Sequence, residues 1–166
     1  AAVPEKVVAA AEKALGGLDA LISNAGIISR FPLLDLSVDD YERSFDINTR
    51  ATWLLGKAAH PMLAASNGCI VATASISGHQ PTPPLGAYSA SKAAVQMLIK
   101  QMAVEWGPDG IRCNTVSPGS THTAMTDKRY SDPAQRSEAA KKNPLQTVGE
   151  PEDQAQRPGR GAPDAR

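Results

Sequence analysis

The stretch "GCIVATASI", residues 68–76, is a short and nearly continuous apolar run of the kind that forms a buried β-strand. After a proline-rich loop comes "YSASKAAVQMLIKQMAVEWG", residues 88–107, in which apolar positions occur nearly all the way round a helix. Gly107 and Pro108 end that helix, and "GIRCNTVSPG", residues 110–119, predicts a further strand. A strand, a helix and a strand in this order predict two parallel strands joined by a right-handed crossover.

The residues before this unit show the same alternation of helix and strand. Residues 5–15 repeat apolar positions at helical spacing and predict a helix that ends at Gly16-Gly17. Residues 18–27, "LDALISNAGI", predict a buried strand that is closed by a tight turn.

Two more helices are predicted between these strands. The first is expected to begin after Ser37, which is placed as an N-cap, and to end near Asn48. The second is expected to run from Thr49 to Ala65, with a kink at Pro61, because proline removes a helical hydrogen bond.

Together these segments predict an α/β fold with a doubly wound, Rossmann-like parallel sheet. Only three strands can be counted in the sequence, so the sheet is expected to be partial at both ends. The partial catalytic domain is expected to cover residues 1–153. Residues 154–166, "QAQRPGRGAPDAR", contain no apolar run and are predicted to be a disordered or aberrant tail.

Charge and composition limit the classes of function. The 166 residues include 17 Lys and Arg and 17 Asp and Glu, so no basic field predicts a nucleic acid or an anionic membrane as partner. No run approaches the roughly 20 apolar residues of a membrane span. Cys69 and Cys113 lack metal-ligand spacing, which predicts reduced thiols, a cytoplasmic location and no metal site.

Tyr88 and Lys92 stand four residues apart in the helix predicted for residues 88–107. Positions i and i+4 share a helix face, so the phenol and the ammonium are expected to point into the same space. An ammonium within about 4 to 6 Å favours the phenolate form of tyrosine, which can act as a general acid or base. The pair alone is a weak signal, because tyrosine and lysine also occur at this spacing by chance.

Further motifs stand at defined distances from Tyr88. Ser75 lies thirteen residues before it, Asn48 forty residues before it, and the Asn-Ala-Gly turn at residues 24–26 begins sixty-four residues before it. The run "SPGSTHTAM", residues 117–125, follows the next predicted strand. Together with the Tyr-x-x-x-Lys pair, these motifs resemble in order and spacing the short-chain dehydrogenase/reductase family in its classical form.

The resemblance covers roughly residues 5–153 and implies roles for four side chains. Tyr88 would be the general acid or base that exchanges a proton with a carbonyl or alcohol oxygen. Lys92 would favour the phenolate and hydrogen-bond the nicotinamide ribose. Ser75 would donate a hydrogen bond to the substrate oxygen. Asn48 would anchor a water molecule that links Lys92 to solvent.

The resemblance also implies an NAD(P)-dependent oxidoreductase with NAD or NADP as cofactor. Its substrate would be a small molecule, either a carbonyl compound or a secondary alcohol. Besides Tyr88 and Lys92, the residues implied in cofactor binding lie in two turns: Asn24, Ala25, Gly26, Pro118, Gly119, Thr121 and Thr123. The family pattern further implies a homodimer or homotetramer built on the helix of residues 88–107 and the helix before it. Burial within one chain is the alternative explanation for their apolar positions.

One motif of the family is missing. The Gly-x-x-x-Gly-x-Gly turn, which holds the cofactor pyrophosphate, does not occur in the sequence. The residue that selects between NAD and NADP belongs to the same missing part. The chain is therefore expected to be a fragment of a longer enzyme. The alternative is a catalytically inactive fragment or pseudoenzyme that retains only the association helices.

Polar residues close to these motifs receive simpler interpretations. Ser89 and Ser91 are interpreted as serines of the capping kind, which are common where a helix begins. Ser77 is interpreted as a loop hydroxyl. His79 and His122 border the expected substrate pocket but are interpreted as solvated loop residues.

Overall fold

The computed structural model describes residues 3–155. These residues form two compact units, of which unit 1 extends to Ser117 and unit 2 begins at Pro118. The expectation that residues 1–153 act as one catalytic domain stays a prediction.

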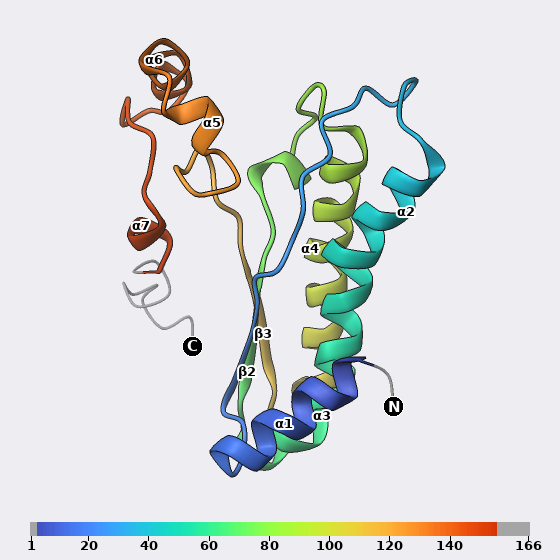
Figure 1. Cartoon of the computed structure of the whole chain (residues 1–166). Coiled ribbons are helices and arrows are strands. Elements are labelled where there is room, and N and C mark those ends of the chain that lie inside the picture. Colours follow the sequence, from blue (N-terminus) through green and yellow to red (C-terminus); the bar gives the residue numbers. More distant parts are fainter. Residues whose placement is uncertain (1–2, 156–166) are drawn as a thin grey trace. The chain divides into compact units, whose positions relative to one another are not determined.

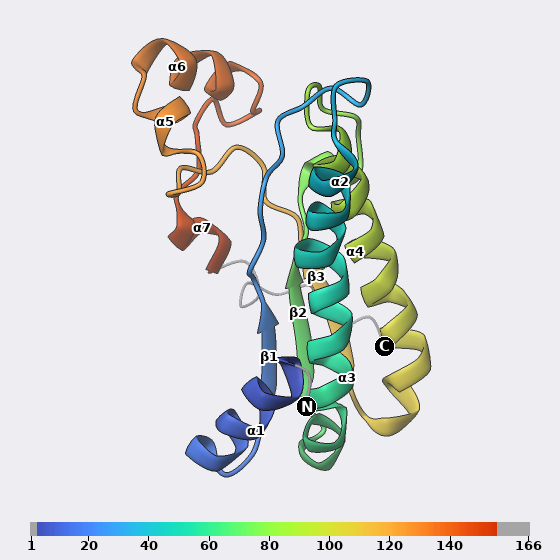
Figure 2. The same ribbon diagram turned by 45° about the vertical axis from the view of Figure 1, so that its right-hand side comes forward.

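Unit 1 is built on three parallel strands: β1 (Ala20–Ser23), β2 (Cys69–Thr73) and β3 (Arg112–Val116). β2 lies in the centre, where Cys69 has Ala20 beside it on one side and Arg112 on the other. Figure 2 shows the three strands side by side. All three predicted strands are confirmed, and so is the α/β, Rossmann-like fold with a parallel sheet.

Four helices of unit 1 correspond to the predicted ones: α1 (Val3–Leu15), α2 (Val38–Phe45), α3 (Ala51–Ser66) and α4 (Gly86–Trp106). In both views α3 and α4 run alongside the sheet (Figures 1 and 2). Ser37 is the N-cap of α2, as predicted, because its Oγ accepts a hydrogen bond from Asp40 N at 3.1 Å. Pro61 lies inside α3, which continues past it to Ser66.

The helix end predicted near Asn48 is wrong. A π-helical turn, η1 (Asp46–Arg50), joins α2 directly to α3. In this turn the backbone N–H of Ala51 donates to Asp46 O, five residues earlier, so the helix accommodates one extra residue without ending. Asparagine is a residue type that often ends a helix. Asn48, however, is only 1% exposed, and its side-chain polar atoms form hydrogen bonds inside unit 1.

The core of unit 1 forms where α3 and α4 pack with the sheet. Its buried side chains include Ala59 and Leu63 of α3, Ile70 and Ala72 of β2, and Val95 and Ile99 of α4. Alternate residues of β2 are buried and half-buried, so one face of the strand makes most of this contact. Gly56 allows α3 to approach α4 closely, since a Cβ there would lie 3.3 Å from atoms of Met102 and Trp106.

Unit 2 is small and mainly helical. Its helices are α5 (Asp127–Tyr130), α6 (Pro133–Lys141) and α7 (Pro151–Ala155). Tyr130, Ala139 and Val148 form its small hydrophobic cluster. Thr121 pairs with Gly149 through an isolated parallel bridge.

The first two residues of the predicted tail lie in a short helix. α7 includes Gln154 and Ala155, because a proline at its start and two acids in its first turn favour a short helix there. The rest of the predicted tail, residues 156–166, lies outside the described residues. Within residues 3–155, no helix combines the length and the apolar character needed to cross a bilayer.

The cap of α2 can be tested by replacing Ser37 with alanine. This change is expected to lower the free energy of unfolding by about 1 kcal/mol, because Asp40 N loses its acceptor. Urea unfolding followed by circular dichroism measures the difference. Ser37→Asn keeps an acceptor at the cap and serves as control. Equal losses in the two variants would contradict the assigned role of the cap.

Candidate active site

The predicted acid/base pair lies on α4. Lys92 Nζ is 5.8 Å from the centre of the Tyr88 ring. Tyr88 is half-buried, whereas Lys92 is only 4% exposed. The two side chains are therefore close in space, as their spacing on the helix requires.

The buried ammonium of Lys92 is held by the central strand. Nζ donates a hydrogen bond of 2.7 Å to the carbonyl oxygen of Thr73, the last residue of β2. Burial lowers the pKa of Lys92 from 10.5 to about 8, because the charged ammonium loses hydration. The side chain is therefore mostly charged at neutral pH but close to the range in which it can release a proton.

Asn48 ties η1 to the segment that follows β1. Its Oδ1 accepts a hydrogen bond from Ile27 N at 2.8 Å, and its Nδ2 donates to Ile27 O at 3.0 Å. The second proton of Nδ2 goes to Ser91 Oγ on α4, at 2.9 Å. One buried carboxamide thus connects three segments that are far apart in the sequence.

Gly26 lies where Asn48 and Lys92 come close together. A Cβ at this position would lie 3.1 Å from Asn48 Oδ1 and 3.3 Å from Lys92 Nζ. Glycine therefore keeps open a small space next to the ammonium. Asn24, two residues earlier, is exposed, and its Oδ1 accepts a hydrogen bond of 2.9 Å from Thr73 Oγ1. Thr73 thus contacts Asn24 through its side chain and Lys92 through its carbonyl.

Ser75 follows β2 and is the N-cap of a short 3-10 turn, η2 (Ile76–Gly78). Its Oγ accepts a hydrogen bond from Ser77 N at 3.1 Å. Its carbonyl oxygen accepts one from Gln96 Nε2, on α4, also at 3.1 Å. Ser75 is therefore attached to the same helix that carries Tyr88.

The other predicted cofactor residues are more widely distributed. Ala25 is exposed in unit 1. The residues Pro118, Gly119, Thr121 and Thr123 belong to unit 2. Within unit 2, Thr121 Oγ1 donates to Gly119 O at 3.3 Å, and Thr123 N donates to Thr126 Oγ1 at 2.9 Å. A cofactor site formed by both units stays a prediction.

The capping interpretation of Ser91 is wrong. The residue lies inside α4, whose N-cap position is Leu85, and its hydroxyl bonds Asn48 and the carbonyl of Tyr88. Thr73 and Gln96 also contact the site residues but were not among the predicted ones. Both carried a usable signal, because one is a polar residue at the end of a buried strand and the other a polar residue in a largely apolar helix.

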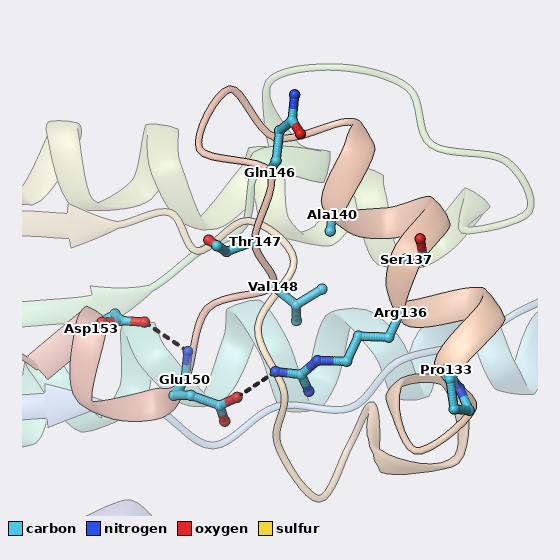
Figure 3. Close-up of a pocket in the computed structure, with 9 residues that line it drawn as sticks. All are labelled: Pro133, Arg136, Ser137, Ala140, Gln146, Thr147, Val148, Glu150 and Asp153. Carbon is cyan, nitrogen blue, oxygen red and sulfur yellow. Dashed lines mark hydrogen bonds and ion pairs between the residues drawn. The ribbon is translucent and has the colours of Figure 1, made fainter.

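Unit 2 contains a pocket of its own, shown in Figure 3. Arg136 Nη2 and Glu150 Oε1 form an ion pair of 2.8 Å in this pocket. Asp153 Oδ2 accepts a hydrogen bond from Glu150 N at 2.8 Å. The predicted site residues are not part of its lining.

The parallel sheet and the tyrosine–lysine pair on its crossover helix define a Rossmann-like α/β protein with a candidate acid/base site. Residues 2–157 match the family model described as Enoyl-(Acyl carrier protein) reductase. Among the curated relatives at 36% identity or more are proteins with short-chain dehydrogenase/reductase, dehydrogenase and reductase names. The chain belongs to the short-chain dehydrogenase/reductase family.

Two relatives illustrate the sequence similarity. Dehydrogenase/reductase SDR family member 4 of Bos taurus is 36% identical over 151 residues, which cover 90% of this chain and 54% of that protein. Cyclopentanol dehydrogenase of Comamonas testosteroni is 44% identical over 112 residues, which cover 67% of this chain and 45% of that protein. The chain therefore spans about half the length of these relatives.

Solved structures share the fold. A gluconate 5-dehydrogenase from Burkholderia cenocepacia, in complex with NADP and tartrate, has a TM-score of 0.83 and 28% identity, covering 89% of this chain and 58% of that one. The protein gox2181 has a TM-score of 0.84 and 29% identity, covering 90% of this chain and 60% of that one. The chain thus matches about three fifths of each structure.

The burial of Lys92 predicts a specific dependence of stability on pH. The unfolded chain holds the lysine proton with a pKa near 10.5 and the folded chain with a pKa of about 8. Between these values the unfolded chain binds more protons, so the free energy of unfolding is expected to rise with pH, by up to about 3 kcal/mol. Urea unfolding at pH 7.5 and pH 10.5 measures the change. The control is Lys92→Met, which has no ammonium to titrate. If the free energy of unfolding changed with pH in the same way in both proteins, the assignment of the change to Lys92 would be contradicted.

Gly78 provides a second test, of the loop that carries Ser75. A Cβ at Gly78 would lie 2.8 Å from the carbonyl carbon of Lys92, so Gly78→Ala must push the loop away from α4. A loss of about 1–3 kcal/mol in the free energy of unfolding is expected from this overpacking. The matched control is Gly17→Ala, where no atom lies within 4 Å of the added Cβ. Similar stabilities of the two variants would show that the loop has room to spare.

Proposed function

We propose that the protein acts as an NAD(P)-dependent oxidoreductase, which transfers a hydride between a nicotinamide and a carbonyl or secondary alcohol. The observation that carries the proposal is the buried ammonium of Lys92, which lies beside the Tyr88 ring and is fixed by the end of β2. Burying an ammonium is costly unless it is well bonded, and perturbed groups of this kind are common at functional sites.

The residues around Lys92 fit a nicotinamide cofactor. Gly26 leaves open a space that a single Cβ would fill, next to Lys92 Nζ and Asn48 Oδ1. Lys92 would hydrogen-bond the ribose there, and the Asn24–Gly26 turn would line the cleft. The turn of Pro118, Gly119, Thr121 and Thr123 would complete the nicotinamide end. When bound, the cofactor would supply or accept the hydride, while the protein provides position and electrostatics.

In this proposal Tyr88 is the acid/base. Its hydroxyl would give a proton to the substrate oxygen during reduction and take one during oxidation. The neighbouring Lys92 would exchange protons readily, because its pKa of about 8 is close to neutral pH. Ser75 would donate a hydrogen bond to the substrate oxygen and stabilise the charge that develops on it.

Asn48 would link Lys92 to solvent through a water molecule. Both protons of Nδ2 are engaged with protein acceptors, so the amide nitrogen has no capacity left for this role. Oδ1 accepts a hydrogen bond from Ile27 N, and an amide oxygen has two lone pairs. The water would therefore be anchored by Oδ1 of Asn48, on the side where Gly26 leaves space.

The substrate is proposed to be a small carbonyl compound or secondary alcohol. The relatives' names support this class, since they include a cyclopentanol dehydrogenase and a carbonyl reductase. A homodimer or homotetramer is proposed as the assembly. Its support is the group of exposed apolar side chains on α3 and α4, which includes Trp53, Met97 and Val104. A cytoplasmic location stays a prediction.

The second candidate is a catalytically inactive member of the family that keeps only the association helices. The specific observation in its favour is that no Gly-x-x-x-Gly-x-Gly turn occurs in the sequence. A chain without this turn lacks the usual contacts to the cofactor pyrophosphate. Binding of the cofactor separates the two candidates.

The proposed function predicts that the 166-residue chain binds NADH or NADPH in a saturable way. Lys92→Ala is expected to weaken binding by about tenfold, because it removes a charged hydrogen-bond donor. Tyr88→Phe is expected to retain binding and to lose carbonyl reduction. Titration calorimetry and nicotinamide fluorescence measure the binding. A folded wild-type chain that binds neither nucleotide would favour the inactive candidate.

A further inference from the structure

Ser91 lies in the sequence between Tyr88 and Lys92, the two residues proposed for proton transfer. It is fully buried, with 0% exposure, and directly precedes Lys92 in α4. Its Oγ is 2.9 Å from Asn48 Nδ2 and 2.8 Å from the carbonyl oxygen of Tyr88. A single hydroxyl thus connects the carboxamide of Asn48 to the backbone of Tyr88.

The direction of these hydrogen bonds is determined by chemistry. The carbonyl oxygen of Tyr88 can only accept, so the one proton of the Ser91 hydroxyl points toward it. Ser91 Oγ must then accept from Asn48, which requires Nδ2 and not Oδ1 on that side. The same orientation places Oδ1 opposite Ile27 N, which is a donor.

A flipped carboxamide would lose both ends of this arrangement. Nδ2 would face the N–H of Ile27, so two donors would oppose each other. Oδ1 would face Ser91 Oγ, whose proton is already committed to Tyr88. Ser91 and the backbone of Ile27 therefore act together to keep Oδ1 on the side of Gly26, where a Cβ at residue 26 would lie 3.1 Å from it.

A second contact strengthens the same connection. Thr49 Oγ1, next to Asn48 in η1, donates to the backbone oxygen of Ser91 at 3.0 Å. η1 and α4 are thus joined at two neighbouring points, one of which is the Ser91 side chain and the other its main chain.

We propose that Ser91 is a positioning residue of the site, which acts by setting the orientation of the Asn48 carboxamide relative to Tyr88 and Lys92. The proposal deepens the function given above and rests on it for its catalytic consequence. Its structural part, the fixed orientation of Asn48, stands on the hydrogen bonds of the described residues.

The test uses the 166-residue chain labelled with nitrogen-15. The Asn48 side-chain amide is assigned from its absence in Asn48→Asp, and its hydrogen exchange is followed by NMR. Ser91→Ala is expected to accelerate this exchange by about tenfold or more, because a buried donor loses its acceptor. The backbone amides of Ile70 and Ile99, in the core, are expected to keep their wild-type rates.

The chain offers a matched control on the same helix. Ser89 Oγ is buried and has no hydrogen-bond partner among the described residues, so Ser89→Ala removes the same atom without breaking a bond. It is expected to leave the Asn48 amide unchanged. Ser91→Thr keeps the hydroxyl and is expected to restore slow exchange. If Ser91→Ala does not fold, Ser91→Cys replaces it. Cysteine sulfur is a weak hydrogen-bond acceptor, so the Asn48 amide is expected to exchange faster than in the wild type but more slowly than with no acceptor.

The proposal would be overturned if the Asn48 amide exchanged equally slowly in the wild type, in Ser91→Ala and in Ser89→Ala. On the same samples, Ser91→Ala is expected to lower kcat for carbonyl reduction by about tenfold with little change in KM, because misplaced catalytic groups slow the reaction itself. An unchanged kcat would overturn the catalytic part. A wild-type chain that binds neither NADH nor NADPH would contradict the proposed function instead, and the exchange rates would still decide the role of Ser91.

Discussion

The site depends on the burial of one cation. An ammonium inside a protein loses most of its hydration, and it stays there only when the surrounding backbone supplies acceptors. In this chain the acceptor is the carbonyl of Thr73 at the end of the central strand, so the site is tied to the middle of the sheet. The lysine also holds α4 against β2, and the tyrosine on that helix is placed by the same contact.

The neighbouring features make this burial possible. Gly26 has no side chain that would crowd the ammonium. Asn48 is the buried residue of the π-helical turn, which lies between two helices. Asn48 satisfies both backbone polar groups of the half-buried residue Ile27. The side chains of Lys92 and Asn48 thus form the hydrogen bonds that backbone groups of Thr73 and Ile27 require at this end of the sheet.

Much of this arrangement could be predicted from the sequence. Apolar runs predicted the three strands, and apolar positions together with helix-end signals such as the Ser37 N-cap predicted the four helices of unit 1. The closeness of Tyr88 and Lys92 followed from spacing alone. The π-helical turn could not be predicted, since "DINTR" has the polar composition of a helix end, and its central asparagine is buried through hydrogen bonds to residues far away in the sequence. Ser91 was missed for a similar reason, because its partner lies 43 residues away.

The π-helical turn has a consequence for how this site could arise and change. It holds one residue more than an α-helical turn, and the flanking helices α2 and α3 continue on either side of it. Insertion or loss of a single codon can therefore create or erase the turn while the rest of the helix keeps its register. In evolutionary terms, the turn and the asparagine at its centre can appear or disappear in one mutational step, and the hydrogen bonds to Ile27 and Ser91 appear or disappear with them.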